Sequence, residues 1–260
     1  MPRFFVRAEQ ISDGTVTILG DDAHHISRSL RMAGGENVTV SDMQKKEYLC
    51  ELTDFLPDRV IAKVLEVHES DTEPPFCATV FQALPKGDKL DSIIQKTVEC
   101  GASRLVPFES ERCVVRMKDG AEEKKTERRA RIAFEAAKQC GRGVIPTVQP
   151  TVTFAKAIEE ASKADLALFC YEGDQTKPLP SVLREWRSLK SQKGDAPATV
   201  SIMIGSEGGF SLSEKEHAIE KGMIPVGLGK RILRTETAAS FVLACLVYEL
   251  ELSEDCDDSL

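Results

Sequence analysis

Two glycine-containing turns near the C-terminus hold the residues of this chain best suited to chemistry. The first reads Gly205-Ser-Glu-Gly-Gly209, and the second, from Leu228 to Ala238, reads Leu-Gly-Lys-Arg-Ile-Leu-Arg-Thr-Glu-Thr-Ala. Glycine lets a backbone approach a ligand closely. Arginine can stabilise a developing negative charge, and a neighbouring carboxylate can accept a proton. The pattern predicts a ligand-binding site, with Arg231, Arg234 and Glu236 clustered at the second turn.

Both turns follow segments that the apolar pattern predicts to be buried strands, one ending at Ile204 and one covering 224–228. A helix is expected from Thr235 onward. The carboxyl ends of parallel strands meet at one edge of a sheet, where α/β proteins bind their ligands. We therefore expect the two turns to lie side by side and to line one crevice.

Common phosphate-binding and metal-binding motifs are missing from the sequence. The first turn lacks the G-x-G-x-x-G spacing of dinucleotide-binding proteins, and no Gly-Lys-Ser/Thr ends it as in a Walker loop. The 8 cysteines form no C-x-x-C pair and no Cys/His cluster with zinc-binding spacing. We expect reduced thiols and no metal site.

The composition is that of a globular protein, with 260 residues, 42% of them hydrophobic, and a formal net charge of -8. The longest apolar run, 241–248, is shorter than the roughly 20 residues of a membrane helix. No apolar segment follows Arg3 and Arg7 as in a signal peptide, so a cytoplasmic protein is expected. Such an acidic chain does not coat nucleic acid by charge alone, although bases outnumber acids between Lys86 and Arg142.

The first 70 residues or so contain short β-type segments separated by Gly, Asp and Asn turns, which predicts a small barrel. The expected strands are 4–6, 15–19, 38–40, 48–52 and 60–64. One helix is expected between Asp21 and Gly34. The polar, proline-ended segment 69–75 marks the domain boundary.

Beyond this boundary, strands and helices alternate, which is typical of an α/β domain with a parallel sheet. The expected strands are 79–84, 104–108, 166–171, 199–204 and 224–228, and the expected helices are 89–99, 124–139, 154–163, 183–190, 213–221 and 235–250. The pattern alone predicts an open, Rossmann-like sheet.

The two C-terminal turns resemble those of the RsmE family of RNA methyltransferases. The resemblance extends through nearly the whole chain, to Pro2-Arg-Phe-Phe5, Asp22-Ala-His-His-Ile26, Leu30-Arg-Met32, Leu84-Pro-Lys-Gly-Asp88, Gln95-Lys96, and Gln139-Cys-Gly-Arg142 with Pro146. Its specific part is the glycine turn combined with the run from Arg231 to Ala238. One position departs from the family, which usually has proline where this chain has Ser206; this alters the stiffness of the turn.

The resemblance implies an α/β fold with two domains. A PUA-like RNA-binding β-barrel domain (1–72) precedes a parallel-sheet SPOUT α/β-knot domain (76–252), and an acidic tail (253–260) follows. In the knot, the last helix threads a loop. Knots are so rare that periodicity gives no reason to expect one.

The resemblance also implies S-adenosylmethionine (SAM) as cofactor and N3 of a uridine in 16S ribosomal RNA of the small subunit as the methylated atom. It implies a homodimer whose last helices pack together, which the apolar residues of that helix would allow. These residues are Ala239, Val242, Leu243, Leu246, Val247 and Leu250.

By the same resemblance, three loops hold SAM: 169–173, 205–209 and 228–238. Backbone groups near Leu228, Gly229, Ile232 and Leu233 would hold the adenine. The candidate cofactor-binding residues are Phe169, Tyr171, Glu172, Ile204, Gly205, Gly208, Gly209, Leu228, Gly229, Ile232, Leu233, Thr237 and Ala238.

Uracil N3 is a poor nucleophile until its proton leaves. Arg234 is the candidate for the cation that favours the uracil anion, and Glu207 or Glu236 is the candidate proton acceptor. A simple salt bridge is the alternative role for each. Glu236 could also be a helix-start carboxylate, since it lies in the first turn of the expected helix.

Basic residues in several segments are candidates for RNA contact. Arg28 and Arg31 are expected on one face of the first helix, beside His24 and His25. Arg231 could hold a phosphate. Further candidate phosphate contacts are Lys86, Lys89, Arg112, Arg116 and Arg142.

Two other functions stay open. A ribose 2′-O-methyltransferase of the same class would share the cofactor pocket, although the motifs at 84–88 and 139–142 argue against it. An RNA-binding ribosome assembly factor without catalysis would bind SAM weakly or not at all.

Overall fold

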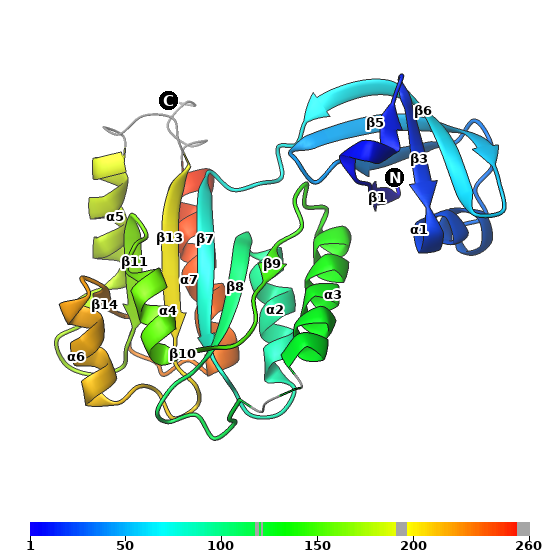
Figure 1. The fold of residues 1–260 in the computed structure, drawn as a ribbon. Coiled ribbons are helices and arrows are strands. Elements are labelled where there is room, and N and C mark those ends of the chain that lie inside the picture. Colours follow the sequence, from blue (N-terminus) through cyan, green and yellow to red (C-terminus); the bar gives the residue numbers. More distant parts are fainter. Residues whose placement is uncertain (118–119, 121, 191–196, 254–260) are drawn as a thin grey trace. The chain divides into compact units, whose positions relative to one another are not determined.

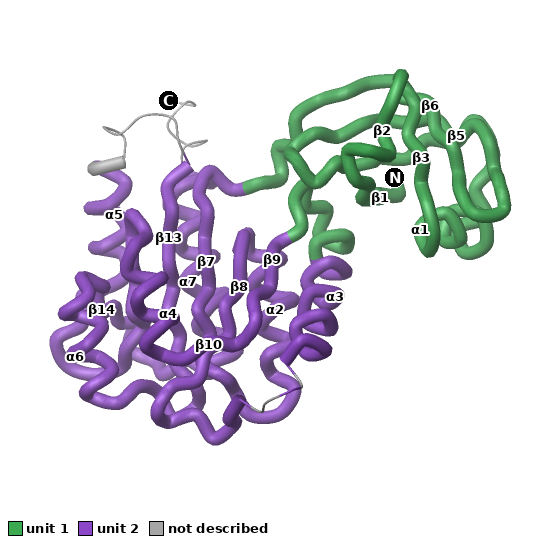
Figure 2. Tube along the Cα trace, in the orientation of Figure 1, with its two compact units in different colours: residues 1–73, 137–145 green, residues 74–136, 146–260 purple. Residues whose placement is uncertain are grey.

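The computed structural model describes residues 1–117, 120, 122–190 and 197–253. The chain forms two compact units, residues 1–73 with 137–145, and residues 74–136 with 146–260 (Figure 2). Segment 137–145, which the sequence pattern places in the C-terminal domain, thus belongs to the first unit. Residues 254–260 of the expected acidic tail lie outside the described residues.

Hydrogen bonds and two ion pairs, Lys138 with Asp22 and Arg142 with Glu73, attach segment 137–145 to the rest of the first unit. The Arg142 guanidinium forms an ion pair with Glu73, with 2.5 Å between Nη2 and Oε2. The Gly143 amide donates to Thr72 Oγ1 at 2.9 Å, and Ser41 Oγ donates to the Gly143 carbonyl at 2.8 Å. The sequence pattern did not predict this return of the chain.

The first unit is built on a six-stranded sheet with the order β1-β4-β5-β6-β3-β2. Inward side chains such as Val16, Ile18 and Val60 are at most 1% exposed, and they alternate with outward ones, as expected for strands with one buried face. The expected strands are all present, and β1 pairs with β4 in parallel. The strands are β1 (Arg3–Phe5), β2 (Ile11–Ser12), β3 (Thr15–Leu19), β4 (Asn37–Ser41), β5 (Lys46–Phe55) and β6 (Arg59–Glu69).

The expected helix between Asp21 and Gly34 is shorter than predicted. It consists of α1 (Gly20–His24) and a π-helical turn, η2 (His25–Ser29). Arg31 has a φ of 53°, a left-handed conformation that cannot continue a helix. Arg28 and Arg31 therefore do not share a helix face. A short 3₁₀ turn, η1 (Ala8–Gln10), precedes β2.

The second unit has an eight-stranded sheet with the order β10-β8-β7-β13-β11-β14-β12, in which β9 also pairs with β8. All its strand pairs are parallel, which confirms the predicted α/β architecture. Its central strands are continuous apolar runs because helices cover both faces. The strands are β7 (Phe76–Ala83), β8 (Ala102–Glu109), β9 (Thr147–Val148), β10 (Val152–Thr153), β11 (Leu166–Cys170), β12 (Lys177–Pro178), β13 (Ala198–Ile204) and β14 (Ile224–Gly227).

Helices cover both faces of this sheet (Figure 1). The helices α2 and α7 pack against each other on one face, and α4 covers the other. The helices are α2 (Lys89–Glu99), α3 (Glu122–Cys140), α4 (Phe154–Ala161), α5 (Leu179–Lys190), α6 (Leu212–Glu220) and α7 (Thr235–Val247), which a π-helical turn, η3 (Tyr248–Leu252), extends.

A capping box starts α6 directly after the glycine turn. Ser211 Oγ accepts from the Glu214 amide at 3.2 Å, and Glu214 Oε2 accepts from the Ser211 amide at 2.9 Å. The pair satisfies two amides that would otherwise lack partners at the helix start. It therefore fixes where the glycine turn ends.

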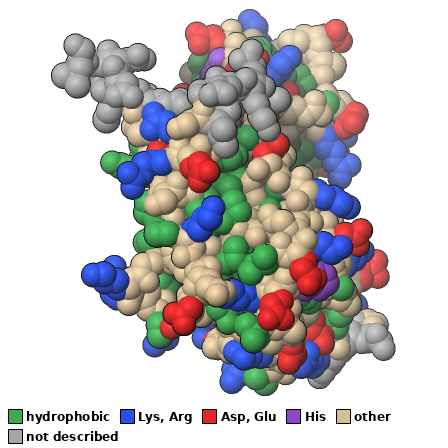
Figure 3. Space-filling view, turned by 90° about the vertical axis from the view of Figure 1, so that its left-hand side faces the viewer, with side chains coloured by type: hydrophobic (Ala, Val, Ile, Leu, Met, Phe, Trp, Pro, Cys, Tyr) green, Lys and Arg blue, Asp and Glu red, His purple; other side chains and the backbone are tan. Residues whose placement is uncertain are grey.

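Within the described ranges, no helix is both long and apolar enough to cross a membrane. Acidic and basic side chains are interspersed on the face shown in Figure 3, with apolar side chains between them. That face carries no continuous basic surface, in keeping with the net charge of -8.

Candidate functional site

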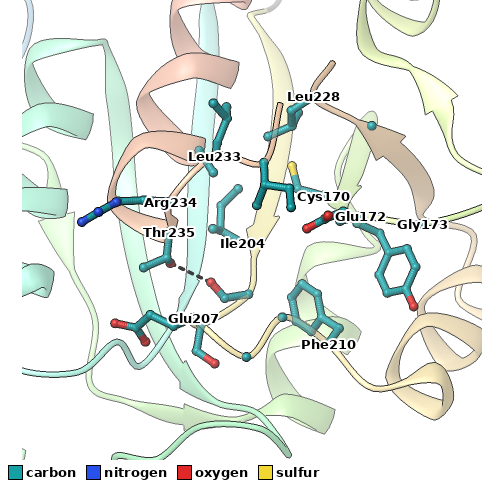
Figure 4. A pocket seen from close by; sticks show the side chains of 18 of the residues that line it. Cys170, Glu172, Gly173, Ile204, Glu207, Phe210, Leu228, Leu233, Arg234 and Thr235 are labelled. Atoms are coloured by element: carbon teal, nitrogen blue, oxygen red, sulfur yellow. Dashed lines mark hydrogen bonds between the residues drawn. The ribbon is translucent and has the colours of Figure 1, made fainter. Parts of the chain in front are cut away.

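A pocket of about 720 Å³ opens at the carboxyl ends of β11, β13 and β14. This is the edge where ligands bind in parallel α/β sheets, and the volume is typical of small-molecule sites. The sequence analysis expected the two glycine turns to lie side by side. In the structure β11 lies between β13 and β14, so the strands that precede the two turns are not neighbours. They still meet, since Thr235 Oγ1 donates to the Gly205 carbonyl at 2.7 Å (Figure 4).

The glycine turn after β13 requires its glycines. The Gly209 amide donates to the Ser206 carbonyl at 2.9 Å, and Gly209 has a φ of 65°. A Cβ on Gly205 would stand 3.1 Å from the Gly209 Cα, and one on Gly208 would stand 3.1 Å from the Arg112 Cβ. Both are closer than normal carbon contacts, so side chains here would push the turn open.

One side of the pocket consists mainly of apolar side chains and backbone, with Glu172 as a charged exception, and Figure 4 shows Leu228, Leu233, Ile204 and Phe210 around the pocket. The predicted cofactor residues that line the pocket are Tyr171, Glu172, Ile204, Gly205, Gly208, Gly209, Leu228, Gly229, Ile232, Leu233 and Ala238.

Two predicted cofactor residues do not line the pocket. Phe169 is fully buried behind it, with its ring 4.3 Å from that of Phe210 and 6.2 Å from that of Tyr171. It supports two lining residues instead of facing the cavity. Thr237 is exposed, and its amide donates to the Arg234 carbonyl at 2.9 Å within the first turn of α7.

Several lining residues were missed by the sequence analysis. A rule that includes the residues directly flanking each glycine turn would have found Phe210 and Gly227, whereas Thr176 carries no such signal. Burial raises the pKa of the Cys170 thiol to about 12, so this group is un-ionised and inert at neutral pH. The missed residues are Thr176, Phe210 and Gly227. Lys89 was predicted as a phosphate contact, and the lining residues that lie in the three predicted loops without having been named individually are Cys170, Gly173, Ser206, Lys230 and Thr235.

The other side of the pocket is charged, and in Figure 4 Arg234 and Glu207 lie across Ile204 from Glu172 and Phe210. The Lys89 ammonium, at the start of α2, lies 2.8 Å from Glu207 Oε1 and 3.6 Å from Glu236 Oε2. Arg234 Nη1 is 3.9 Å from Glu236 Oε1. Its side chain is 83% exposed, so the guanidinium is free to meet a ligand.

The two glutamates differ in how their oxygens are occupied. Glu207 accepts from the Lys89 ammonium at 2.8 Å and from the Lys86 amide at 3.2 Å. Partial burial acts to raise the pKa of Glu207, but these hydrogen bonds outweigh it, and the net pKa is lowered. Glu236 Oε2 is buried and has no hydrogen-bond partner in the described part of the chain. Glu236 is thus the carboxylate with an unused acceptor.

The predicted RNA contacts fall into two groups, in different units. Lys86, Arg112 and Arg231 are exposed in the second unit, and the last two line the pocket. Arg28 and Arg31 are exposed in the first unit.

Arg142 differs from the other candidates, because it is 4% exposed and paired with Glu73. A buried, paired guanidinium does not reach a phosphate, so the prediction of an RNA contact is corrected to a structural role. Arg116 is exposed, and its guanidinium donates to Glu109 Oε1 at 2.9 Å. No cluster of His, Cys, Asp and Glu suited to a metal ion occurs among the described residues.

Known proteins share both the sequence and the fold. The family model for an RNA methyltransferase domain matches residues 72–247, and the one for an RNA methyltransferase PUA domain matches 18–65. Ribosomal RNA small subunit methyltransferase E of Bacillus subtilis (strain 168) is 34% identical over 97% of this chain and 98% of its own.

Two solved structures are also similar over both chains. Ribosomal RNA small subunit methyltransferase E from Neisseria gonorrhoeae, bound to S-adenosyl methionine, is 31% identical with a TM-score of 0.79, covering 95% of this chain and 97% of its own. A methyltransferase from Legionella pneumophila in complex with SAM is 29% identical with a TM-score of 0.77, covering 95% and 96%. With the pocket and the parallel sheet, these matches show that the chain belongs to the RsmE family of RNA methyltransferases, with a PUA-like domain followed by a SPOUT α/β-knot domain.

Proposed function

We propose that this protein uses SAM to methylate N3 of a specific uridine in 16S ribosomal RNA of the small subunit, acting as a homodimer. The observation that carries the proposal is one pocket with two unlike sides. Glycines and apolar side chains form one side, and Arg234, Glu236, Lys89 and Glu207 form the other. The first suits a nucleoside-containing cofactor, and the second suits a base that must lose a proton.

The residues present fit SAM. Cβ atoms on Gly209 or Gly229 would meet no atom within 4 Å, so these two glycines leave open space and exposed backbone at the pocket. Leu228, Ile232 and Leu233 offer apolar contact and backbone groups to the adenosine, as pockets of this kind do. When bound, SAM supplies an electrophilic methyl group.

Glu236 is the proton acceptor in this proposal. Its Oε2 atom accepts no hydrogen bond from any described residue, whereas Glu207 already accepts from Lys86 and Lys89. The N3 proton of the uracil moves to the Glu236 carboxylate, and the electron pair of the N–H bond stays on N3. The Lys89 ammonium lies 3.6 Å from Oε2, where its positive charge faces the carboxylate.

Arg234 stabilises the uracil anion. Deprotonation at N3 spreads negative charge onto O2 and O4, and an exposed guanidinium can donate to either oxygen. Arg234 is the N-cap residue of α7, and Glu236 lies in the first turn of that helix. One short segment therefore carries both the cation and the base.

RNA phosphates meet scattered basic side chains. Arg112 and Arg231 line the pocket, and the exposed Lys86, Arg28 and Arg31 are further candidate phosphate contacts. The lining side chains that carry charge are Lys89, Arg112, Glu172, Glu207, Lys230, Arg231, Arg234 and Glu236, which leaves the pocket net positive. A local positive site on an acidic protein suits a shaped RNA target bound for one turnover.

The homodimer proposal rests on other side chains than the sequence suggested. Four apolar residues of the last helix are fully buried within one copy of the chain, so they cannot face a partner. They are Ala239, Val242, Leu243 and Leu246. Phe241 and Tyr248 are 38% and 66% exposed on the last helix and its extension. They supply the apolar surface for a second copy. Sedimentation of a Phe241→Asp/Tyr248→Asp variant should show monomers, and an unchanged mass would remove this contact.

The test of the reaction uses small ribosomal subunits from cells lacking this protein, labelled SAM, and nucleoside analysis of the RNA. We expect label in 3-methyluridine. Label on a ribose oxygen would assign the protein to 2′-O-methylation. Binding of SAM without any transfer would mean a different RNA, and absence of SAM binding would contradict the enzyme function altogether.

A further inference from the structure

A buried amide connects three separate chain segments beside the pocket. Gln82, near the end of β7, is 0% exposed, and its Nε2 donates to Thr235 Oγ1 and to the Ala83 carbonyl, each at 2.9 Å. Thr235 Oγ1 donates in turn to the Gly205 carbonyl at 2.7 Å. The last β7 residues, the glycine turn after β13 and the start of α7 are thus joined through two side chains.

The orientation of the Gln82 amide is fixed by its surroundings. Its nitrogen faces the carbonyl oxygens of Ala83 and, at 3.5 Å, of Gly205. A flipped amide would place its own oxygen against both of them. Gln82 therefore donates a hydrogen bond to Thr235, and Thr235 donates one to Gly205.

Packing alone does not account for this residue. Gln82 Oε1 is buried and has no hydrogen-bond partner among the described residues, which costs free energy that a methionine of similar size would not incur. The donor side of the amide, in contrast, is used on Thr235, whose neighbours in sequence are Arg234 and Glu236.

The first turn of α7 has no side-chain cap of its own. The Arg234 carbonyl accepts from the amides of Thr237 and Ala238 at 2.9 and 3.0 Å, but the Arg234 side chain makes no capping hydrogen bond. We infer that Gln82 is a positioning residue, which holds Thr235 and thereby places Arg234 and Glu236 relative to the glycine turn. The functional part of this inference rests on the proposed roles of Arg234 and Glu236.

The test compares Gln82→Met with a matched control, Ser201→Ala. Ser201 is 2% exposed in β13, and its Oγ donates to the Ala161 carbonyl at 2.7 Å, away from the pocket-lining residues. Gln82→Met should lower kcat about tenfold, the effect of one hydrogen bond on a transition state, while KM and the SAM Kd change less than about threefold. Ser201→Ala should lower Tm and leave kcat within about twofold.

Thr235 variants test the path of the effect. Thr235→Val should lower kcat at least as much as Gln82→Met, Thr235→Ser should restore most of it, and the double variant should lose no more than Thr235→Val alone. A double variant whose loss in kcat equals the product of the losses in Gln82→Met and Thr235→Val would overturn the inference. So would a Gln82→Met kcat within about twofold of wild type, or an equal kcat loss in Ser201→Ala.

Amide hydrogen exchange gives a readout that needs no activity. The amides of Thr237 and Ala238 should exchange faster in Gln82→Met than in wild type or in Ser201→Ala, and equal protection in all three would overturn the positioning role. Because the rate assay counts total methyl transfer, a wild type that methylates another RNA atom would remove the proposed function. The comparison of kcat and amide exchange between wild type and the variants would still test the positioning role of Gln82.

Discussion

The ammonium of Lys89 lies 2.8 Å from a carboxylate oxygen of Glu207, although the two residues are 118 positions apart. This ion pair occupies one of the two glutamates at the charged side of the pocket. The other, Glu236, keeps a buried oxygen that accepts no hydrogen bond within the described ranges of the chain. The division of roles between the two carboxylates follows from it. In the proposed mechanism, Glu207 anchors the cation and Glu236 accepts the substrate proton.

Replacing Lys89 by methionine should lower kcat/KM for RNA by about fivefold, the upper end of what a partly exposed ion pair contributes. Without the ammonium, the Glu207 and Glu236 carboxylates repel each other and the incoming RNA. Steady-state methyl transfer measures the effect. Lys89→Arg should recover most of the loss, and Lys163→Met, which changes an exposed lysine at the end of α4, should cost nothing. Equal rates for wild type and Lys89→Met would contradict the role of the ion pair.

Arg234→Ala should reduce kcat by about 10²- to 10³-fold, the usual effect of removing a donor to a developing anion. The fold and the dimer should be unchanged, because the side chain is 83% exposed. Single-turnover rates with saturating SAM isolate this step. Arg184→Ala, an exposed arginine on α5 that does not line the pocket, is the control. Near-wild-type turnover by Arg234→Ala would exclude Arg234 from the mechanism.

The stability contribution of Glu207 should depend on pH. Its pKa in the folded protein lies below the ordinary value of 4.5, so its carboxylate stabilises the folded state above that value. The contribution is lost as the pH falls through the lowered pKa. The pKa of Lys89 is raised by its hydrogen bond to Glu207, so its share is lost only in strongly alkaline solution.

Thermal unfolding of wild type and Glu207→Gln between about pH 3 and 8 measures the contribution of the Glu207 carboxylate to stability. The difference in Tm should be constant near neutrality and should shrink toward zero on acidification. A difference that persists unchanged at low pH would mean that the glutamine fails for a steric reason, and that the ion pair with Lys89 contributes nothing.

The strands beneath the pocket could be predicted because a parallel sheet covered on both faces gives apolar runs. Leu166–Cys170 and Ala198–Ile204 are such runs, and each ends where a polar or glycine-rich loop begins. The glycine turn could be predicted because its glycines directly follow the end of one such run at Ile204. The start of α7 at Thr235 also matches the expected helix start.

Residues that act through distant partners could not be predicted. Gln82 lies within an apolar strand and meets Thr235, 153 positions away, so no local pattern distinguishes it from a chance polar residue. Arg142 matched a motif, but its burial against Glu73 depends on how segment 137–145 returns to the first unit. The order of β13, β11 and β14 is likewise set by tertiary packing.

Ser206, at the position where the family usually has proline, offers a stability test. Its hydroxyl is buried without a hydrogen-bond partner in the described ranges, so Ser206→Ala should leave the free energy of unfolding unchanged or raise it by up to about 1 kcal/mol. Ser211→Ala, which removes the helix cap of α6, should lower it by about 1 kcal/mol. Urea denaturation measures both. A loss in Ser206→Ala as large as in Ser211→Ala would show that the Ser206 hydroxyl has a stabilising partner.

The most direct test of the account is the single-turnover rate of methyl transfer by Glu236→Gln beside that of Glu207→Gln, with SAM affinity measured for both by calorimetry. Glutamine keeps the shape of each side chain and removes its ability to accept a proton. We predict a loss of about 10²- to 10⁴-fold for Glu236→Gln, the usual contribution of a general base, and a much smaller loss for Glu207→Gln, with SAM binding unchanged in both. A rate for Glu236→Gln close to wild type, or a larger loss in Glu207→Gln, would contradict the assignment of Glu236 as the proton acceptor.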